Sequence, residues 1–339
     1  MIWARAEGCR VWDTEGREYI DLSAGFGVAA LGHRDRRVLA AIAAQPVAHA
    51  LGDLAEAEVA VALRRRLPWP AKFGVTGEDA VEIALRTALL ASGKPGIVAF
   101  GGAYHGTGLL ALAATGFERF REPFAPWLPG PVHRRPYGED PGPLPADAGC
   151  VIAEPVQGRA GARVPPDGWL EVLRSRCDEA GALLVVDAIY AGLGRVGELW
   201  PGEAVADVLT LGKALGHGLP ISAALFLRPG LEEAWRLGPE DVLTHTHVLN
   251  PLACAAAHVV LDEVPGLLDR VVEAGERFAA AGFEGRGLLR SRAGDWEEAW
   301  RRGVLVIPAG EDGSLISATP PLTISAAEID EALARLADV

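Results

Sequence analysis

Ala182-Leu-Leu-Val-Val-Asp187 is apolar at every position before its last residue. Val151-Ile-Ala153 is apolar throughout as well. A strand that is apolar at consecutive positions, and not only at alternating ones, is buried on both faces, as in a parallel sheet covered by helices. These two runs therefore predict an α/β fold built around a mostly parallel central sheet.

The pattern around these runs alternates between strand, loop and helix. We expect strands at 71–75, 96–100 and 150–154, and helices at 80–92 and 168–180. Such alternation is typical of a sheet whose strands are joined by covering helices. The sequence thus predicts one large domain with a mostly parallel sheet between helices.

The two ends of the chain differ from this central part. Near the N-terminus, 10–21 predicts a hairpin whose turn uses Gly16 at positive φ, and 36–44 and 55–67 predict helices. The Pro- and Gly-rich stretch 120–147 is interpreted as a long surface excursion. The C-terminal part is helix-rich, with a strand expected at 304–307 and a closing helix from Ala326. We therefore divide the chain into an N-terminal segment joining the small domain (1–45), a large domain (46–245) and a smaller α+β domain (246–339).

Charge limits the partners of the protein. The 339 residues include 45 acidic and 32 basic side chains, a formal net charge of −13. A surface of this sign repels the phosphate backbone, so we do not expect nucleic acid as a partner. Half of the residues are hydrophobic and 23% are charged, which is the composition of a globular protein and not of a disordered or coiled-coil chain.

The cytoplasm is the expected location. The four cysteines are scattered without any C-x-x-C pair, which suggests neither a disulfide framework nor a zinc knuckle. The start of the chain carries charges where a signal peptide needs an apolar segment, and no run approaches the ~18 apolar residues of a membrane span, so no membrane association is expected. Only three lysines and one asparagine occur, which fits a heat-adapted or a GC-rich source.

Three motifs resemble known binding sites but lack the context that such sites need. Gly192-Leu-Gly-Arg-Val-Gly197 matches the dinucleotide pattern G-x-G-x-x-G, yet Pro201 and Gly202 prevent the helix that should follow. His245-Thr-His247 has no third ligand at metal spacing, so no metal site is expected. Gly212-Lys213-Ala214 lacks the other positions of a Walker loop.

Two further loops follow predicted strands. In Val75-Thr-Gly-Glu-Asp-Ala80, Thr76 and Asp79 have capping-box spacing, and a helix starting here would offer free N–H groups to a phosphate. Taken alone, this feature is more simply an ordinary capped helix. Gly101-Gly-Ala-Tyr-His-Gly106 adds Tyr104, whose ring could lie flat against a planar ligand, although alone it is a turn with an aromatic residue.

A carboxylate and a lysine complete this set. Asp187 ends an apolar strand at the edge where open α/β sheets bind ligands, and it needs a cationic partner such as a protonated ring nitrogen. Lys213, in Leu209-Thr-Leu-Gly-Lys-Ala-Leu-Gly216, has apolar surroundings that lower the pKa of an amine and favour a nucleophile able to form a Schiff base. Lys72 and Lys94 lack such surroundings. A phosphate cradle, a stacking Tyr, this Asp and this Lys together describe a pyridoxal 5′-phosphate (PLP) site.

A series of short motifs runs in order from about Gly8 to the C-terminus. Through these motifs the chain resembles the class III aminotransferases of PLP fold type I, the group of acetylornithine, ornithine, 4-aminobutyrate and other ω-amino acid aminotransferases. The motifs are Val11-Trp-Asp13, Tyr19-Ile-Asp21, Ser23-Ala-Gly25, Leu31-Gly-His33, Ala103-Tyr-His-Gly106, Glu154-Pro-Val-Gln-Gly158, Gly192-Leu-Gly-Arg195, Leu211-Gly-Lys-Ala214, Asn250-Pro-Leu-Ala-Cys254 and Pro320-Pro-Leu-Thr-Ile324.

The resemblance implies roles around the cofactor ring. Lys213 forms the internal aldimine with PLP and moves the substrate proton, and Asp187 keeps the pyridine nitrogen protonated. Tyr104 and Ile189 sandwich the ring, and His105 is expected at the cofactor beside Tyr104. These residues would make Lys213, Asp187 and Tyr104 the catalytic group.

The resemblance also implies how the rest of the cofactor is held. Gln157 approaches the ring hydroxyl, and backbone groups of Gly77 and Glu78 bind the phosphate. The Glu78 carboxylate would repel that phosphate unless its side chain turns away along the helix. Thr246 corresponds to a Thr that reaches the phosphate from the neighbouring subunit, which implies a homodimer with shared active sites.

Two positions that handle substrate carboxylates in relatives differ here. An Arg usually precedes Pro-Pro-Leu and a Glu follows Glu-Pro-x-Gln-Gly, but this chain has Ser317 and Arg159 at these positions. One interpretation is that Arg159 binds a substrate carboxylate from the opposite side, with Glu154 as a second candidate substrate residue. The other is that Arg159 is a solvated loop residue and the substrate is a simple amine. Tyr190 also stands where Gln or Met is usual.

The expected function is ping-pong transfer of an amino group between an ω-amino acid or amine and a keto acid, either 2-oxoglutarate or pyruvate. Epimerases or racemases, an aminomutase and decarboxylases share the fold, so they remain alternatives. A PLP-binding relative without catalysis is a further alternative, which the presence of both Lys213 and Asp187 disfavours.

Overall fold

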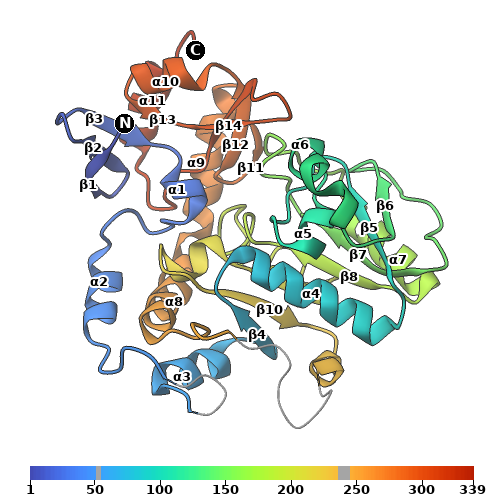
Figure 1. Cartoon of the computed structure of the whole chain (residues 1–339). Helices are drawn as coiled ribbons and strands as arrows, with labels where there is room; N and C mark the ends of the chain where they lie inside the picture. The colour runs from blue at the N-terminus through green and yellow to red at the C-terminus, as the bar shows by residue number, and fades with distance from the viewer. Residues whose placement is uncertain (51–54, 236–244) are drawn as a thin grey trace.

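The computed structural model describes residues 1–50, 55–235 and 245–339. Within these residues the strands form one seven-stranded sheet and two four-stranded sheets. Figure 1 shows the large sheet with helix α4 across it, and the N-terminal and C-terminal strands together in a separate part of the molecule. The α/β class with a large mostly parallel sheet and a smaller α+β part is confirmed.

The large sheet has the strand order β4-β10-β9-β8-β7-β5-β6. Neighbours from β9 to β6 are parallel, and β10 is antiparallel to both of its neighbours, β4 and β9. Every strand except β10 therefore points the same way. The strands are β4 (Ala71–Gly74), β5 (Gly96–Phe100), β6 (Val132–Arg135), β7 (Ala148–Ala153), β8 (Leu183–Asp187), β9 (Val208–Leu211) and β10 (Ser222–Phe226).

Both faces of this sheet are covered, as the apolar runs predicted. Leu183 and Val185 of β8 pack in the cluster beneath α4 (Gly77–Ser92), whereas Leu184 and Val186 pack in the cluster that includes α7 (Trp169–Ala180). Successive strand side chains point to opposite faces, so a strand that is buried on both sides must be apolar at every position.

The smaller part combines the two ends of the chain. One sheet has the order β1-β2-β3-β13 and the other the order β11-β12-β15-β14. The hairpin predicted over 10–21 is confirmed as β2 and β3, with Gly16 at φ 83°. The strands are β1 (Trp3–Glu7), β2 (Arg10–Asp13), β3 (Glu18–Asp21), β11 (Glu284–Arg286), β12 (Leu289–Ala293), β13 (Val304–Leu305), β14 (Ile307–Ala309) and β15 (Leu315–Ala318).

The remaining helices connect and cover these sheets. The longer ones are α2 (Arg36–Ala43), α3 (Glu58–Arg66), α8 (Pro251–Glu263), α9 (Leu268–Ala280) and α11 (Ala326–Arg335). Shorter helices are α1 (Ala24–Gly27), α5 (Leu109–Ala114), α6 (Glu118–Arg121) and α10 (Trp296–Arg301), with 3₁₀ turns η1 (Glu122–Trp127), η2 (Lys213–Gly216), η3 (Leu231–Trp235) and η4 (Val264–Leu267).

Two predictions about elements were wrong in part. The stretch 120–147 is not only a surface excursion, because Val132–Arg135 forms β6, the edge strand of the large sheet. The single strand expected at 304–307 is divided between β13 and β14, which belong to different sheets. The closing helix from Ala326 is confirmed as α11, and Gly192–Gly197 opens no helix, as its context predicted.

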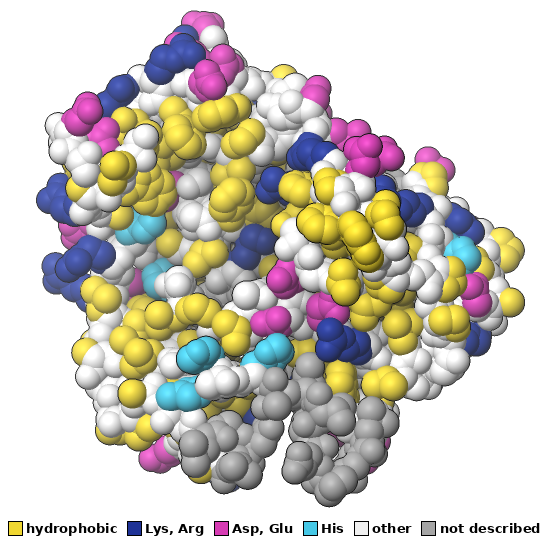
Figure 2. All heavy atoms as spheres, viewed as in Figure 1, with side chains coloured by type: hydrophobic (Ala, Val, Ile, Leu, Met, Phe, Trp, Pro, Cys, Tyr) yellow, Lys and Arg dark blue, Asp and Glu magenta, His cyan; other side chains and the backbone are white. Residues whose placement is uncertain are grey.

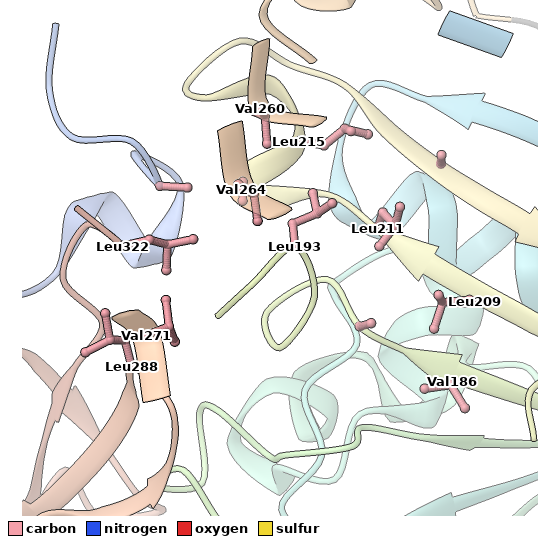
Figure 3. Close-up of a cluster of buried hydrophobic side chains, with 14 of the residues drawn as sticks. Val186, Leu193, Leu209, Leu211, Leu215, Val260, Val264, Val271, Leu288 and Leu322 are labelled. Carbon is pink, nitrogen blue, oxygen red and sulfur yellow. The ribbon is translucent and has the colours of Figure 1, made fainter. Parts of the chain in front are cut away.

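A continuous hydrophobic core connects the large sheet with the C-terminal elements. Figure 3 shows this sequence of contacts from Val186 and Leu209 on the sheet, past Leu215 and Val264, to Leu322. Helix α8 packs against η2, α2 and α3. The division at residue 246 stays a prediction, and α8, which it assigns to the small domain, lies on the large one.

One stretch of the described residues has the length and apolar character of a membrane span, contrary to our expectation. It runs over Pro251–Ala280, and half of its most apolar window is buried inside the protein. The first part of this stretch is α8, which contributes core residues such as Val260. The 3₁₀ turn η4, which has Pro265 near its start, separates α8 from α9. A buried core helix accounts for this apolar composition.

Candidate active site

The carboxyl ends of five strands meet at one edge of the large sheet. Because β4, β5, β7, β8 and β9 all point the same way, the residues that follow them lie together. A cavity of about 550 Å³ opens at this edge. Figure 2 shows a hollow at the centre of the viewed face. The five strand ends contribute Gly77, Tyr104, Glu154, Asp187 and Lys213 to its lining, and the smaller part contributes Phe26, Ile307 and Ser317.

Lys213 follows β9 and lies at the start of η2. Its Nζ is 4.2 Å from the centre of the Tyr190 ring, a cation–π distance. Desolvation lowers the pKa of Lys213 below its usual value, and the charge of Asp187 opposes this shift. Tyr190 itself packs tightly, since a Cβ added at Gly158 would lie 2.3 Å from its ring. The predicted nucleophile is therefore an amine with a lowered pKa above an aromatic ring.

Asp187 is buried and fully hydrogen-bonded. Its Oδ2 lies 2.7 Å from His105 Nδ1, and its Oδ1 accepts hydrogen bonds from the Ile189 amide at 3.1 Å and the Thr210 hydroxyl at 3.2 Å. The His105 backbone is fixed by Thr115 Oγ1 at 3.1 Å. Nδ1 donates to this carboxylate, and the other ring nitrogen of His105 is buried without a partner. The pair thus concentrates negative charge at the cavity.

Glu154 is a second buried acid of the cavity. Its Oε1 accepts a hydrogen bond from the Tyr104 amide at 3.0 Å. The pKa of Glu154 is raised to about 7, chiefly by burial; Asp187 adds to this rise, and His105 and Lys213 oppose it. Glu154 therefore holds the backbone of Tyr104 and exchanges its proton near neutral pH.

The N-terminus of α4 also faces the cavity. The capping box is confirmed, with Thr76 Oγ1 accepting from the Asp79 amide and Asp79 accepting from the Thr76 amide. Over the described part of the chain, the amides of Gly77 and Glu78 have no protein acceptor. A Cβ at Gly77 would lie 3.0 Å from Ile189 Cγ2, so the glycine allows Ile189 to pack closely against this turn. Two free N–H groups and the positive helix end suit a phosphate.

The Glu78 carboxylate lines the cavity and is hydrogen-bonded to the neighbouring loop. Its Oε2 accepts hydrogen bonds from the Thr107 amide at 2.8 Å, the Thr107 hydroxyl at 3.0 Å and the Gly108 amide at 3.0 Å. The carboxylate is therefore hydrogen-bonded to the loop before α5. These three hydrogen bonds offset part of the negative charge that a phosphate at this helix end would meet.

Two predicted cofactor residues are not brought to the cavity. Gln157 is fully buried behind the lining, where its Nε2 donates to the Gly101 carbonyl at 2.9 Å, so its amide supports the Tyr104 loop instead of facing a ligand. Thr246 is exposed, and its carbonyl accepts a hydrogen bond from His49. Thr246 does not line the site of its own chain. Its role across a subunit boundary stays a prediction.

Sequence reasoning missed the residues that act through others. Thr210 of β9 lies opposite Asp187 of β8 in the sheet. The register between these two strands cannot be predicted from the sequence of either strand alone. The hydrogen bond between His105 and Asp187 joins residues 82 positions apart. Tyr190 stood out in the sequence as a departure from the usual Gln or Met, but its contact with the Lys213 amine was not predicted. Among the described residues, no group of three or more His, Cys, Asp or Glu could hold a metal ion.

These features fit PLP. A lysine with a lowered pKa can hold an aldehyde, the Asp187–His105 pair can hold a protonated ring nitrogen, and the two free amides at the start of α4 can hold a phosphate. Tyr104 and Ile189 both line the cavity, as their predicted positions on either side of the ring require. The chemistry of the donor set therefore agrees with this cofactor.

Comparisons with known proteins agree with this site. A family model described as Aminotransferase class-III matches residues 1–281. An acetylornithine aminotransferase from Methanopyrus kandleri is 37% identical, with 98% of this chain and 92% of the relative aligned, and a putrescine aminotransferase from Pectobacterium atrosepticum is 32% identical, with 96% and 79% aligned.

Solved structures show the same similarity. An amine transaminase from an uncultivated Pseudomonas species, solved in its PLP-bound form, superposes with a TM-score of 0.90 at 26% identity, covering 99% of this chain and 94% of that one. The ornithine aminotransferase from Toxoplasma gondii superposes with a TM-score of 0.88 at 26% identity, covering 99% and 89%. The match of a family model over most of the chain, and relatives aligned over nearly their whole length, establish that this protein belongs to the class III PLP-dependent aminotransferases.

Proposed function

We propose that this transaminase moves an amino group between an ω-amino acid or amine and a keto acid, in the manner of the acetylornithine and putrescine aminotransferases that it resembles. The observation that carries the proposal is one cavity that holds Lys213, the Asp187–His105 pair and the free N-terminus of α4. This set supplies an amine, a negative charge and an anion site within the same enclosure.

The cofactor supplies the electron-withdrawing ring that accepts the amino group from one substrate and delivers it to the next. The residues of the chain supply position and proton movement. Asp187, oriented by His105 and Thr210, holds negative charge where a protonated ring nitrogen would need it. Burial lowers the pKa of Lys213, which favours the neutral amine that takes a proton from the substrate Cα.

Close packing also fixes the aromatic ring next to the Lys213 amine. Tyr190 packs against Gly27 and Gly158 beneath the Lys213 amine. Tyr190 can pack this closely because both neighbours are glycines. A side chain at Gly158 would displace the Tyr190 ring. Apolar surroundings strengthen the interaction of Asp187 with a ring cation and keep the lysine amine reactive.

We further propose a homodimer in the cytoplasm, with Thr246 of each subunit completing the phosphate site of the other. Support comes from the exposed position of Thr246, outside the cavity of its own chain, and from the free amides of Gly77 and Glu78, which leave room for another donor. Heat resistance, suggested by the low Asn and Lys content, is part of the same proposal.

Chemical trapping tests the proposed function. Borohydride treatment of the purified holoenzyme, followed by peptide mass spectrometry, should place a phosphopyridoxyl group on Lys213 and leave Lys94 unlabelled. Lys94 is a matched internal control, because its Nζ donates to the Ala180 carbonyl away from the cavity. No label, or a label on another lysine, would contradict the proposal.

Turnover completes this test. A panel of ω-amino acids and amines with 2-oxoglutarate or pyruvate should give stoichiometric exchange of the amino group, and Lys213→Ala should lower the rate by at least about 10³-fold. Racemisation that needs no keto acid would contradict a transaminase.

A further inference from the structure

Arg159 is held in a fixed position at the cavity. It belongs to a tight loop after Gln157, in which the Ala162 amide donates to the Gly158 carbonyl at 3.2 Å. The Arg159 carbonyl accepts a hydrogen bond from the Gly310 amide at 3.0 Å, which ties this loop to the residue after β14. The side chain lines the cavity together with Lys213.

Two aromatic rings orient the guanidinium group of Arg159. Its Cζ lies 5.1 Å from the centre of the Tyr104 ring and 5.2 Å from that of the Phe120 ring. The rings pack edge to face, with their centres 5.4 Å apart. Stacking on aromatic faces leaves the edge of a guanidinium group, which carries its N–H donors, free to bind an acceptor.

The donors of Arg159 have no acceptor in the protein. No hydrogen bond or ion pair joins the Arg159 side chain to any residue in 1–50, 55–235 or 245–339, and its Nε is buried without a partner. The acids of the cavity are engaged elsewhere: Glu78 by the loop before α5, Glu154 by the Tyr104 amide, and Asp187 by His105. The Nε donor is buried without an acceptor, which costs free energy unless a ligand binds there.

Ser317, on β15 of the smaller part, does not bring a cation to the cavity. Ser317 uses its hydroxyl to donate to the Arg290 carbonyl at 3.2 Å. The Arg290 side chain is directed to the Gly287 carbonyl at 2.8 Å, outside the cavity. Of the described residues that line the cavity, Lys213 and Arg159 are the two with Lys or Arg side chains. Arg159 is therefore the fixed positive charge that remains for a substrate.

We propose that Arg159 is the carboxylate-binding residue of this active site, so that the enzyme takes carboxylate-bearing amino donors and keto acids in preference to simple amines and aldehydes. This inference rests on the proposed function and adds the substrate class. A carboxylate offers two acceptor oxygens to the planar guanidinium fork, a geometry that the ring-stacked Arg159 presents in advance of binding. The solvated-loop interpretation of Arg159 leaves its position between two rings at the cavity unexplained.

Binding of a non-reacting ligand tests this proposal without turnover. Calorimetry of the holoenzyme should show binding of glutarate and not of glutaramide, its neutral analogue, and Arg159→Ala should weaken glutarate binding by at least about tenfold. Arg159→Lys should recover only part of the affinity, because an ammonium group lacks the fork.

A matched control is Arg119→Ala. Arg119 also stacks on Phe120, at 5.1 Å, but it does not line the cavity. This variant should bind glutarate as the wild type does. Equal affinity of wild type and Arg159→Ala, or equal loss in Arg119→Ala, would overturn the proposal.

Paired donors give a second readout. In single-turnover experiments monitored by the cofactor spectrum, Arg159→Ala should lower kcat/KM for 4-aminobutyrate about 10- to 100-fold and leave butylamine within about threefold. A similar loss for both donors would show a structural role and overturn the proposal. If the wild type converts amines without preferring 4-aminobutyrate, the substrate class is wrong and the transaminase stands. If no donor changes the spectrum, the proposed function fails, and the glutarate titration still decides the role of Arg159.

Discussion

Glu154 is a buried acid of the cavity, and burial raises its pKa to about 7. Its carboxyl group accepts the Tyr104 amide while burial opposes its ionisation. The folded protein therefore binds this proton more tightly than the unfolded chain does, in which a Glu has a pKa of about 4.3. The stability that the neutral form contributes is fully present below that pH and is lost as the pH rises through about 7.

Glu154→Gln removes this titration and keeps an oxygen for the Tyr104 amide. We expect the free energy of unfolding of the variant, relative to wild type, to rise by up to about 3 kcal/mol between pH 5 and pH 8. Urea unfolding at unit steps of pH measures this difference. The exposed Glu118→Gln should show no such trend, and a constant difference for Glu154→Gln would mean that Glu154 has an ordinary pKa.

The meeting of single residues at the cavity was the most predictable feature of the site. Lys213, Asp187 and Tyr104 each follow a strand, and parallel strands bring such positions to one edge. Gln157 was not predictable in the same way, because an amide beside the site can serve the backbone as well as a ligand. The glycine in Tyr104-His-Gly106 serves packing, since a Cβ at Gly106 would lie 2.5 Å from Glu78 Cβ.

At the scale of elements, α4 organises the phosphate site and also α5. Helix α5 has no side-chain cap of its own at Gly108. Glu82 of α4 supplies the missing acceptors: its Oε1 accepts from the Leu110 amide at 2.8 Å and the Ala111 amide at 3.0 Å. Glu78, one turn earlier, accepts the Thr107 and Gly108 amides. Two carboxylates on one face of α4 thus cap the following helix.

Glu82→Ala should destabilise the protein by about 2 kcal/mol, because a buried carboxylate that accepts two amides is removed. Glu82→Gln should cost less, since its amide oxygen can still accept. Chemical unfolding of both variants against Glu118→Ala, an exposed position on α6, provides the measurement. Equal stability of the Glu82→Ala and Glu118→Ala variants would show that α5 does not depend on this cap.

Elements with strong local patterns were predictable and those that depend on distant pairing were not. The strands at 96–100 and 182–186 and the helix at 168–180 were found within a residue or two of their ends. β6 lies in a Pro- and Gly-rich stretch, and it is a strand only because β5 offers it an edge. The sequence predicted a single strand where β13 and β14 lie. The chain changes from one sheet to the other between Leu305 and Ile307, and an apolar run gives no signal for such a change.

A common hydrophobic core joins the two parts of the molecule. Hydrogen bonds from the Arg195 side chain to backbone carbonyls of the smaller part add to this connection. Arg195 is buried, and its guanidinium group donates to the carbonyls of Leu288 at 3.1 Å and Pro320 at 2.5 Å. The cavity lies where these parts meet, since strand ends of the large sheet and residues such as Ser317 of the smaller part both line it. The substrate site therefore depends on how the two parts are joined.

Subunit mixing shows whether the site also needs a second chain. Lys213→Ala removes the amine of one site, and Thr246→Glu places a negative charge where a phosphate donor is proposed. If Thr246 acts across the subunit boundary, a mixed dimer of these inactive variants keeps one site with both Lys213 and Thr246 intact. Free exchange of equal amounts should then restore about a quarter of the wild-type activity, since half of the dimers are mixed and each has one good site of two.

The same mixture separates the two possible arrangements. If Thr246 served its own chain, both subunits of the mixed dimer would carry a defect in their own site, and no activity would return. Light scattering before and after mixing checks that the particles are dimers, and co-purification of differently tagged Lys213→Ala and Thr246→Glu subunits shows that mixed dimers have formed. Mixed dimers without activity would mean that each chain of this enzyme completes its phosphate site alone.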